Sequence, residues 1–296
     1  MTRQFLASLA LAVVAASTPA AHAGLLYGVT TTNNLVSFDS STPGSIQSSN
    51  AVTGTVGNEI LGGIDFRPAT GMLYGINTTG TRIYLIDVLT GSASQVGADS
   101  AVTLSTSGGY GIDFNPTVDR IRVTDSGGTD ANLRYNPNTG ALAFTDASLA
   151  YIASDANAGA NPNIAGVAYI NNDNDPLTGT TLYGIDGLQD VLVTIIPPNA
   201  GGLNTVGALG INAAGLIGFD VDAAGSAFLS SGAGGSSLYS INLNTGAATL
   251  IGGIGRSLSL RGLSAARPNT PIRVPEPAAL ALLGIGLLGV LRRKRS

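Results

Sequence analysis

The 296-residue chain contains no cysteine and no tryptophan, and it has a single histidine, His22. Without cysteine the protein has no disulfide scaffold, no thiolate nucleophile and no metal site with Cys ligands. His22 lies in an N-terminal segment that we expect to be cleaved. The mature protein would therefore also lack the most common general base and zinc ligand.

Basic residues are scarce in the body of the chain. Residues 24–273 carry nine Arg, no Lys, one Glu (Glu59) and sixteen Asp, a net charge of −8. Proteins that neutralise nucleic-acid phosphates need clusters of Lys and Arg. The acidic body therefore argues against nucleic acid as a partner.

The N-terminus has the features of a secretory signal peptide. Arg3 precedes the apolar residues 5–16, and Ala21-His22-Ala23 follows them. A positive start, a short apolar core and an Ala-x-Ala site are typical of such peptides. We expect residues 1–23 to form a cleavable signal helix, with Ala21 and Ala23 as cleavage-site residues. The expected partners at this step are the Sec translocon and a signal peptidase.

The C-terminus combines a Pro-Glu-Pro step, an apolar run and a cluster of cations. Residues 268–277 form a linker that ends in Val274-Pro275-Glu276-Pro277, residues 278–291 are apolar, and residues 292–296 start with Arg292-Arg293-Lys294-Arg295. We expect a transmembrane helix over 278–291, because proline marks a helix start. The basic tail, residues 292–296, would stay on the cytoplasmic side and hold the body outside the inner membrane.

These three parts, in this order, resemble the PEP-CTERM sorting signal. The resemblance covers the last 23 residues. It implies a Gram-negative bacterium that makes exopolysaccharide, and an exosortase that recognises and removes the tail. The body would be anchored transiently in the inner membrane and then reach the cell surface or the secreted matrix. An ordinary C-terminal anchor is the alternative, and it also places the body outside the cytoplasm.

The body contains a repeated unit. Gly63-Ile64-Asp65-Phe66 recurs as Gly111-Ile112-Asp113-Phe114, 48 residues later. Weaker copies are Gly218-Phe219-Asp220-Val221, Gly166-Val167-Ala168-Tyr169 and Gly262-Leu263-Ser264-Ala265. The first four copies along the chain are each followed by three further short apolar runs. Four strands per repeat of about 50 residues predict the blades of a β-propeller, because the rungs of a β-helix are shorter.

The two ends of the body complete one another. The last copy, within residues 261–266, is followed only by the linker, whereas Leu25-Leu26-Tyr27-Gly28-Val29 resembles a second strand such as 73–76. We therefore predict one all-β domain over residues 24–267. It would be a β-propeller of five four-stranded blades, with N- and C-terminal strands sharing one blade. The body also resembles a family of secreted bacterial β-propellers of unassigned function, which implies a fold and no activity.

Two groups of oxygen-bearing side chains are candidate sites. Asp65, Asp113 and Asp220 occupy the same position in three repeats, and alternation along a first strand would point them into the central channel. There they would bind a cation or a polar ligand, or each would instead cap a turn. Asn171, Asp173 and Asp175 alternate as Ca²⁺ ligands do, although a solvated turn explains them too.

We therefore expect a non-enzymatic surface or matrix propeller that binds carbohydrate or protein, such as exopolysaccharide or a surface protein, or has a structural role. With one Glu and no His in the body, we assign no catalytic residue. The first alternative is a glycan-active hydrolase or lyase that uses channel Asp residues. The second is a scaffold stabilised by Ca²⁺, the one candidate cofactor.

Overall fold

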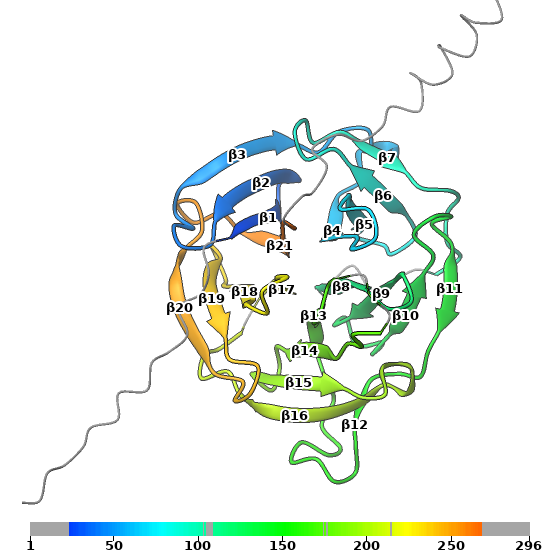
Figure 1. Ribbon diagram of the computed structural model, residues 1–296, viewed down its shortest axis with the longest axis vertical. Coiled ribbons are helices and arrows are strands. Elements are labelled where there is room, and N and C mark those ends of the chain that lie inside the picture. Colours follow the sequence, from blue (N-terminus) through cyan, green and yellow to red (C-terminus); the bar gives the residue numbers. More distant parts are fainter. Residues whose placement is uncertain are drawn as a thin grey trace, which may run out of the picture.

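The structure is a computed structural model that describes residues 24–102, 104, 109–173, 175, 177–213 and 215–267. Over these ranges the chain forms twenty-one strands and two short 3₁₀ helices, grouped into five sheets around a central axis (Figure 1). The predicted signal peptide, sorting motif, transmembrane helix and basic tail lie outside the described residues. Within them, no helix combines the length and the apolar character that crossing a bilayer requires.

Each sheet is one blade, and its strands are numbered along the chain. From the axis outward, blade 1 contains β21 (Leu260–Ala265), β1 (Leu25–Thr30), β2 (Asn34–Asp39) and β3 (Ile46–Ala51). Blade 2 contains β4 (Leu61–Phe66), β5 (Leu73–Asn77), β6 (Ile83–Ile86) and β7 (Ala93–Gln95). Blade 3 contains β8 (Tyr110–Asn115), β9 (Arg120–Asp125), β10 (Asn132–Tyr135) and β11 (Leu142–Thr145).

The remaining two blades follow the same order. Blade 4 contains β13 (Ile164–Tyr169), β14 (Leu182–Asp186), β15 (Val191–Ile195) and β16 (Gly202–Ala208), and β12 (Ala150–Tyr151) adds a parallel fifth strand at its outer edge. Blade 5 contains β17 (Gly218–Val221), β18 (Ala227–Ser231), β19 (Ser237–Ile241) and β20 (Ala248–Gly253). The five-bladed architecture is as predicted, except that the repeat pattern did not indicate β12.

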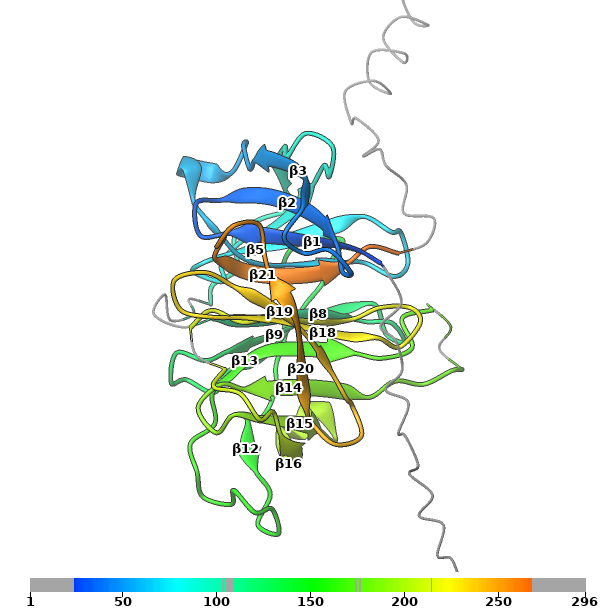
Figure 2. The same ribbon diagram turned by 90° about the vertical axis from the view of Figure 1, so that its left-hand side faces the viewer.

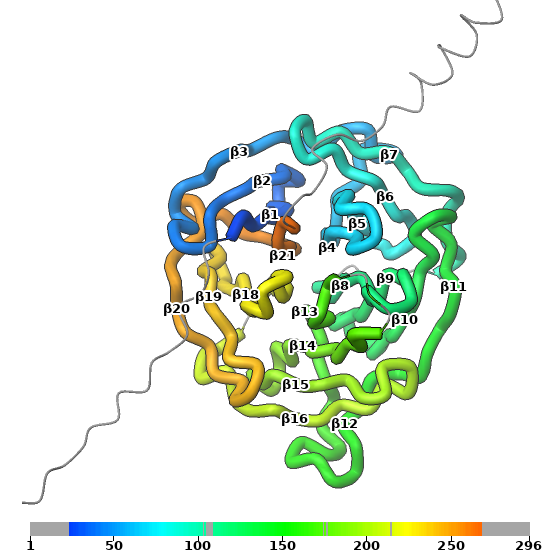
Figure 3. The backbone as a smooth tube through the Cα atoms, viewed as in Figure 1, coloured from blue at the N-terminus to red at the C-terminus, as the bar shows by residue number. Residues whose placement is uncertain are grey.

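The ring closes through blade 1, where the last strand pairs with the first. β21 and β1 are antiparallel, with Leu26 opposite Ala265, and the Ala266 N–H donates to the Leu25 carbonyl at 2.8 Å. Figure 3 shows this joint between the two ends of the colour scale. The prediction that N- and C-terminal strands share one blade is confirmed. Because β1 and β21 run in opposite directions, Gly24 and Arg267 lie at the same face of the disc (Figure 2).

Four of the five hydrophobic clusters among the described residues combine side chains of two neighbouring blades. Ile64 and Phe66 of blade 2 pack in one cluster with Val29 and Leu35 of blade 1. Across the same boundary, the Tyr27 ring meets the Phe66 ring edge-on, with centroids 5.4 Å apart. A blade on its own would leave half of such a core exposed, so all five blades depend on closure of the ring.

Candidate functional site

Three inner strands bring the predicted acids together at the axis. Asp65 lies on β4, Asp113 on β8 and Asp220 on β17, and one carboxyl oxygen of each lies within 4.8 Å of those of the other two. All three are buried, with exposed fractions of 5%, 1% and 3%. The alternation of β-strand side chains explains this placement, because the neighbours of Asp65 on either side, Ile64 and Phe66, enter the core between blades.

The carboxylates accept main-chain hydrogen bonds from the following blade. The Phe114 N–H donates to Asp65 Oδ2 at 2.8 Å, and the Tyr169 N–H donates to Asp113 Oδ1 at 3.1 Å. The Ala265 N–H donates to Asp220 Oδ2 at 2.7 Å. Each donor comes directly after the residue that is aligned with Asp in the next repeat, namely after Asp113, Ala168 or Ser264. The acids accept main-chain N–H groups, as the turn-capping alternative expects, but these donors belong to the next blade, so the acids tie blade to blade.

The two repeats without Asp complete the pattern differently. In blade 1, Ser264 takes the place of Asp, and its Oγ accepts the Phe66 N–H at 3.2 Å. In blade 4, Ala168 has no side-chain oxygen. The Val221 N–H, which the pattern assigns to that position, instead donates to Asp220 Oδ1 of its own blade at 2.6 Å. Four of the five blade junctions at this level thus carry a side-chain tie.

The glycine of the repeat is explained by the same junctions. A Cβ atom on Gly218 would lie 2.6 Å from the Leu263 nitrogen, and one on Gly166 would lie 2.8 Å from the Phe219 Cβ. A Cβ on the corresponding glycines would also meet the next blade, at 2.6 Å from Gly63 to Ile112, 2.9 Å from Gly111 to Val167 and 3.0 Å from Gly262 to Gly63, and the Cβ on Gly111 would also lie 2.4 Å from Thr124 of its own blade. The Gly-x-Asp unit is therefore a device for close contact and hydrogen bonding between blades.

Burial shifts the protonation of the cluster. Burial, followed by the charge of Asp220, raises the pKa of Asp65 well above its ordinary value. Burial also raises the pKa of Asp113, with contributions from the charges of Asp65 and Asp220. For Asp220, burial outweighs the hydrogen bonds from Ala265 and Val221 and raises the pKa to about 6. The folded protein therefore disfavours three ionised carboxyls here unless a positive charge joins them.

The cation Arg267 lies near the cluster. It is the second residue beyond β21, and its guanidinium interacts with the charges of Asp65, Asp220, Asp173 and Asp113. Burial, the largest cause, lowers the pKa of Arg267, and these acids oppose the shift. Sequence reasoning missed Arg267 and Ser264. Ser264 was recognisable only as the residue aligned with Asp in the fifth repeat.

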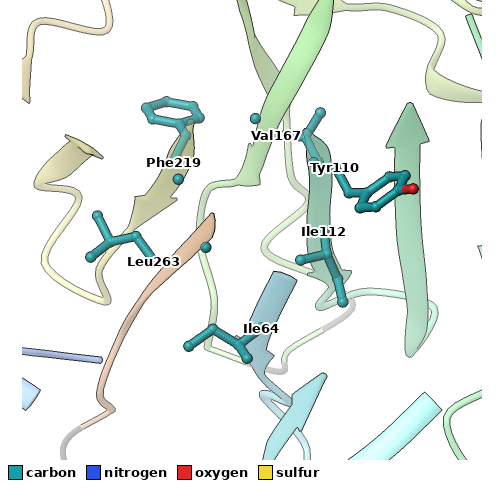
Figure 4. Close-up of a pocket in the computed structure, with 10 residues that line it drawn as sticks. Ile64, Tyr110, Ile112, Val167, Phe219 and Leu263 are labelled. Atoms are coloured by element: carbon teal, nitrogen blue, oxygen red, sulfur yellow. The ribbon is translucent and has the colours of Figure 1, made fainter. Parts of the chain in front are cut away.

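Next to the acids, the axis is apolar. The cavity there has a volume of about 10 Å³, roughly the space of one water molecule, and the residues one place before each repeat's Asp position line it (Figure 4). These residues are Ile64, Ile112, Val167, Phe219 and Leu263, joined by Tyr110. The cavity lacks the converging polar groups by which a ligand pocket fixes a sugar.

The second candidate site lies on the connection between β13 and β14. The exposed Asp173 and Asp175 accept the N–H groups of Asp175 and Leu177 at 2.9 Å each, as in Asx turns. Asn171 donates from Nδ2 to the Gly179 carbonyl at 3.3 Å. These contacts are those of the turn alternative, and Ca²⁺ binding by this loop stays a prediction.

The fold defines the class of protein: a five-bladed β-propeller whose repeated Gly-x-Asp unit joins the blades. The family described as "Domain of unknown function (DUF4394)" matches residues 34–264, and the chain belongs to that family. The PEP-CTERM protein-sorting motif matches residues 273–295, which confirms the resemblance of the tail. This motif implies extracytoplasmic sorting with an exosortase as the processing partner.

Solved structures with a similar chain path include two proteins of different origin. A structural genomics protein of unknown function from Bacteroides thetaiotaomicron is 15% identical, with a TM-score of 0.49 over 84% of this chain and 68% of that chain. A chain of a nidogen/laminin complex is 14% identical, with a TM-score of 0.47 over 82% of this chain and 98% of that chain. No curated protein matches the sequence.

Proposed function

We propose that the protein is a non-enzymatic propeller of the cell surface or extracellular matrix, which binds carbohydrate or protein or serves as a structural part. The observation that carries this proposal is the use of the repeated acids. Asp65, Asp113 and Asp220 are at most 5% exposed, and each accepts a main-chain N–H from the next blade. Side chains committed in this way hold the ring together.

The geometry gives little support to a glycan-active enzyme that uses these residues. Glycosidases place two carboxyl groups about 5–10 Å apart, flanking a bond that the substrate brings into an open cleft. Here the three acids are buried beside an apolar cavity, and one oxygen of each lies within 4.8 Å of those of the other two. A polysaccharide chain has no access to such a cluster without separation of the blades.

The positions of the chain ends suggest which surface meets a ligand. Gly24 and Arg267 lie at one face of the disc, so a tail that continues from Arg267 would hold that face toward the attachment point (Figure 2). The opposite face carries the hairpin connections 31–33, 78–82, 126–131, 187–190 and 232–236. We assign binding to this opposite face, because loops at the free end of a rigid scaffold are the usual carriers of recognition.

The test is a glycan-array and polysaccharide-degradation screen on residues 24–273, a segment that contains all the strands of the closed ring. We expect binding without release of products. Release of shortened glycans would overturn the proposal. In that case Asp113→Asn decides whether the axial cluster is responsible, because this substitution keeps the shape of the side chain and removes its charge.

A further inference from the structure

We propose that the axial cluster of Asp65, Asp113 and Asp220 is a Ca²⁺ site that joins blades 2, 3 and 5 at the centre of the ring. The inference goes beyond the proposed function, because it concerns what holds the propeller together outside the cell and not what the propeller binds. It also places the cation at the axis rather than on the exposed loop at residues 171–175.

The first observation is an unpartnered buried oxygen. Asp113 is 1% exposed, and no donor among the described residues reaches its Oδ2 atom. A side-chain hydrogen bond between this carboxyl and that of Asp220 requires one of the two to be protonated, because two ionised carboxylates have no proton to donate. An unsatisfied buried acceptor costs about 1–3 kcal/mol, and more when it is charged. A cation between the two carboxylates satisfies the Oδ2 atom and removes their repulsion.

The second observation is the balance of charge. With every group ionised, Asp65, Asp113 and Asp220 contribute three negative charges, and Arg267 supplies one positive charge that it shares with Asp173. At least two negative charges therefore stay uncompensated at the axis. A divalent cation neutralises them without protonation of the carboxyls.

The third observation is the size of the cluster. One oxygen from each acid lies within 4.8 Å of those of the other two, so a point at most about 2.8 Å from all three exists, and this range includes the Ca–O distances of about 2.3–2.6 Å. Mg²⁺ requires about 2.1 Å and a regular octahedron, which three acids on separate blades are poorly placed to provide. Ser264 Oγ, 2.8 Å from Asp65 Oδ1 and 3.1 Å from Asp220 Oδ2, lies at the edge of the same cluster as a neutral oxygen.

The blade-to-blade hydrogen bonds favour such a site. The N–H groups of Phe114, Tyr169 and Ala265 fix the carboxylates in orientation and occupy one lone pair on each accepting oxygen. Carboxylates that bind metals are commonly held by such outer contacts. At Ala168, between Asp113 and Asp220 in the order of the ring, a methyl group replaces the oxygen, so the charge is concentrated on the three acids.

The test is calcium binding by purified residues 24–273 after removal of metal with EDTA. Isothermal titration with CaCl₂ should give one ion per chain. At a calcium concentration about 100-fold above Kd, Tm should rise by roughly 5–10 °C. Absence of binding together with an unchanged Tm would overturn the proposal and leave protons as the means by which the cluster is neutralised.

Three variants locate the ion. Asp113→Asn should abolish binding, whereas Asp222→Asn, two residues beyond Asp220 in a surface turn, should bind like the wild type. Asp173→Asn tests the exposed loop, and it should also leave binding unchanged. Loss of binding in Asp173→Asn with retention in Asp113→Asn would overturn the axial assignment.

If Asp113→Asn does not fold, wild-type crystals soaked in TbCl₃ replace it. An anomalous peak between the three axial carboxyls is the expected result. A peak only at residues 171–175, or none, contradicts the proposal.

Discussion

Gly218 offers the sharpest test of the ring contacts. It lies on β17, the inner strand of blade 5, in a conformation that any residue can adopt, since its φ is not among the positive values. A Cβ added there would meet the Leu263 nitrogen at 2.6 Å, the Leu263 Cβ at 2.7 Å and the Ser230 Oγ at 2.7 Å. Two of these atoms belong to β21 of blade 1, so Gly218→Ala has to push two blades apart.

The magnitude follows from two opposing effects. Overpacking of a tight interior costs about 1–3 kcal/mol, and the upper part of that range applies here because a main-chain atom has to move. Replacement of Gly by Ala also stabilises by about 0.4–1 kcal/mol through the unfolded state. We expect a net loss of about 2 kcal/mol, which lowers Tm by roughly 4–8 °C in a domain of this size.

The assay compares the unfolding of Gly218→Ala by urea and by heat with that of a control variant, Gly253→Ala. Gly253 lies on β20 of the same blade, and a Cβ there would meet nothing within 4 Å. The control variant should match the wild type or exceed it slightly, because only the unfolded-state effect remains. Equal stability of the two variants would refute the claim that this glycine is required by contact between blades.

Three further predictions concern the acids and the tail. In EDTA, the free energy of unfolding should fall as pH rises from about 4, the pKa of an unfolded Asp, through about 6, the folded pKa of Asp220. Ca²⁺ should remove most of this fall. A metal-free protein that is most stable at pH 8 would contradict the prediction. Asp65→Ala should lose about 1–3 kcal/mol of unfolding free energy because the Phe114 N–H loses its acceptor. Asp65→Asn in EDTA at pH 8 should be at least as stable as the wild type. Equal losses by the two variants in chemical denaturation would count against the hydrogen bond from Phe114 as the cause. Glu276→Ala should remain at full length in the membrane fraction on immunoblots. The control Asp222→Asn should be processed and released like the wild type. Normal release of Glu276→Ala would show that the Pro-Glu-Pro step is dispensable.

The sign of the pH effect follows from the raised folded pKa values. The folded protein binds protons at the cluster more tightly than the unfolded chain does, so the gain is complete below about pH 4 and is lost as pH rises. Asp39, Asp99, Asp155 and Asp173 have lowered pKa values and act in the opposite direction, but only below about pH 4. Measurements between pH 5 and 8 therefore report on the axial acids, and Asp130, whose pKa burial also raises, acts in the same direction.

Much of the fold could be predicted from spacing alone. Copies such as Gly166-Val167-Ala168-Tyr169 share little chemistry with Gly63-Ile64-Asp65-Phe66, yet their place in the repeat identified them as inner strands. The turns between the third and fourth strands of blades 2, 3 and 5 contain Gly91, Gly140 and Gly246, whose φ values of 76°, 67° and 82° are those that glycine adopts without steric cost.

The partners of the axial acids could not be predicted in the same way. Alternation tells which face of a strand Asp65 occupies, but it does not tell that the Phe114 N–H of the next blade reaches that carboxylate. The approach of neighbouring blades depends on the curvature of the whole ring. Arg267 carried no signal either, because it follows the last strand and belongs to no repeat. β12 is only two residues long, too short to leave a periodic pattern.

The metal content of the purified propeller tests the central claim most directly, namely that the three axial carboxylates form a cation site at the closure of the ring. The protein is exported by cells and purified without chelators. Inductively coupled plasma mass spectrometry should then find one calcium ion per chain. Asp113→Asn prepared in parallel should contain none. A folded wild-type propeller free of calcium, with the same Tm before and after EDTA, would contradict the account.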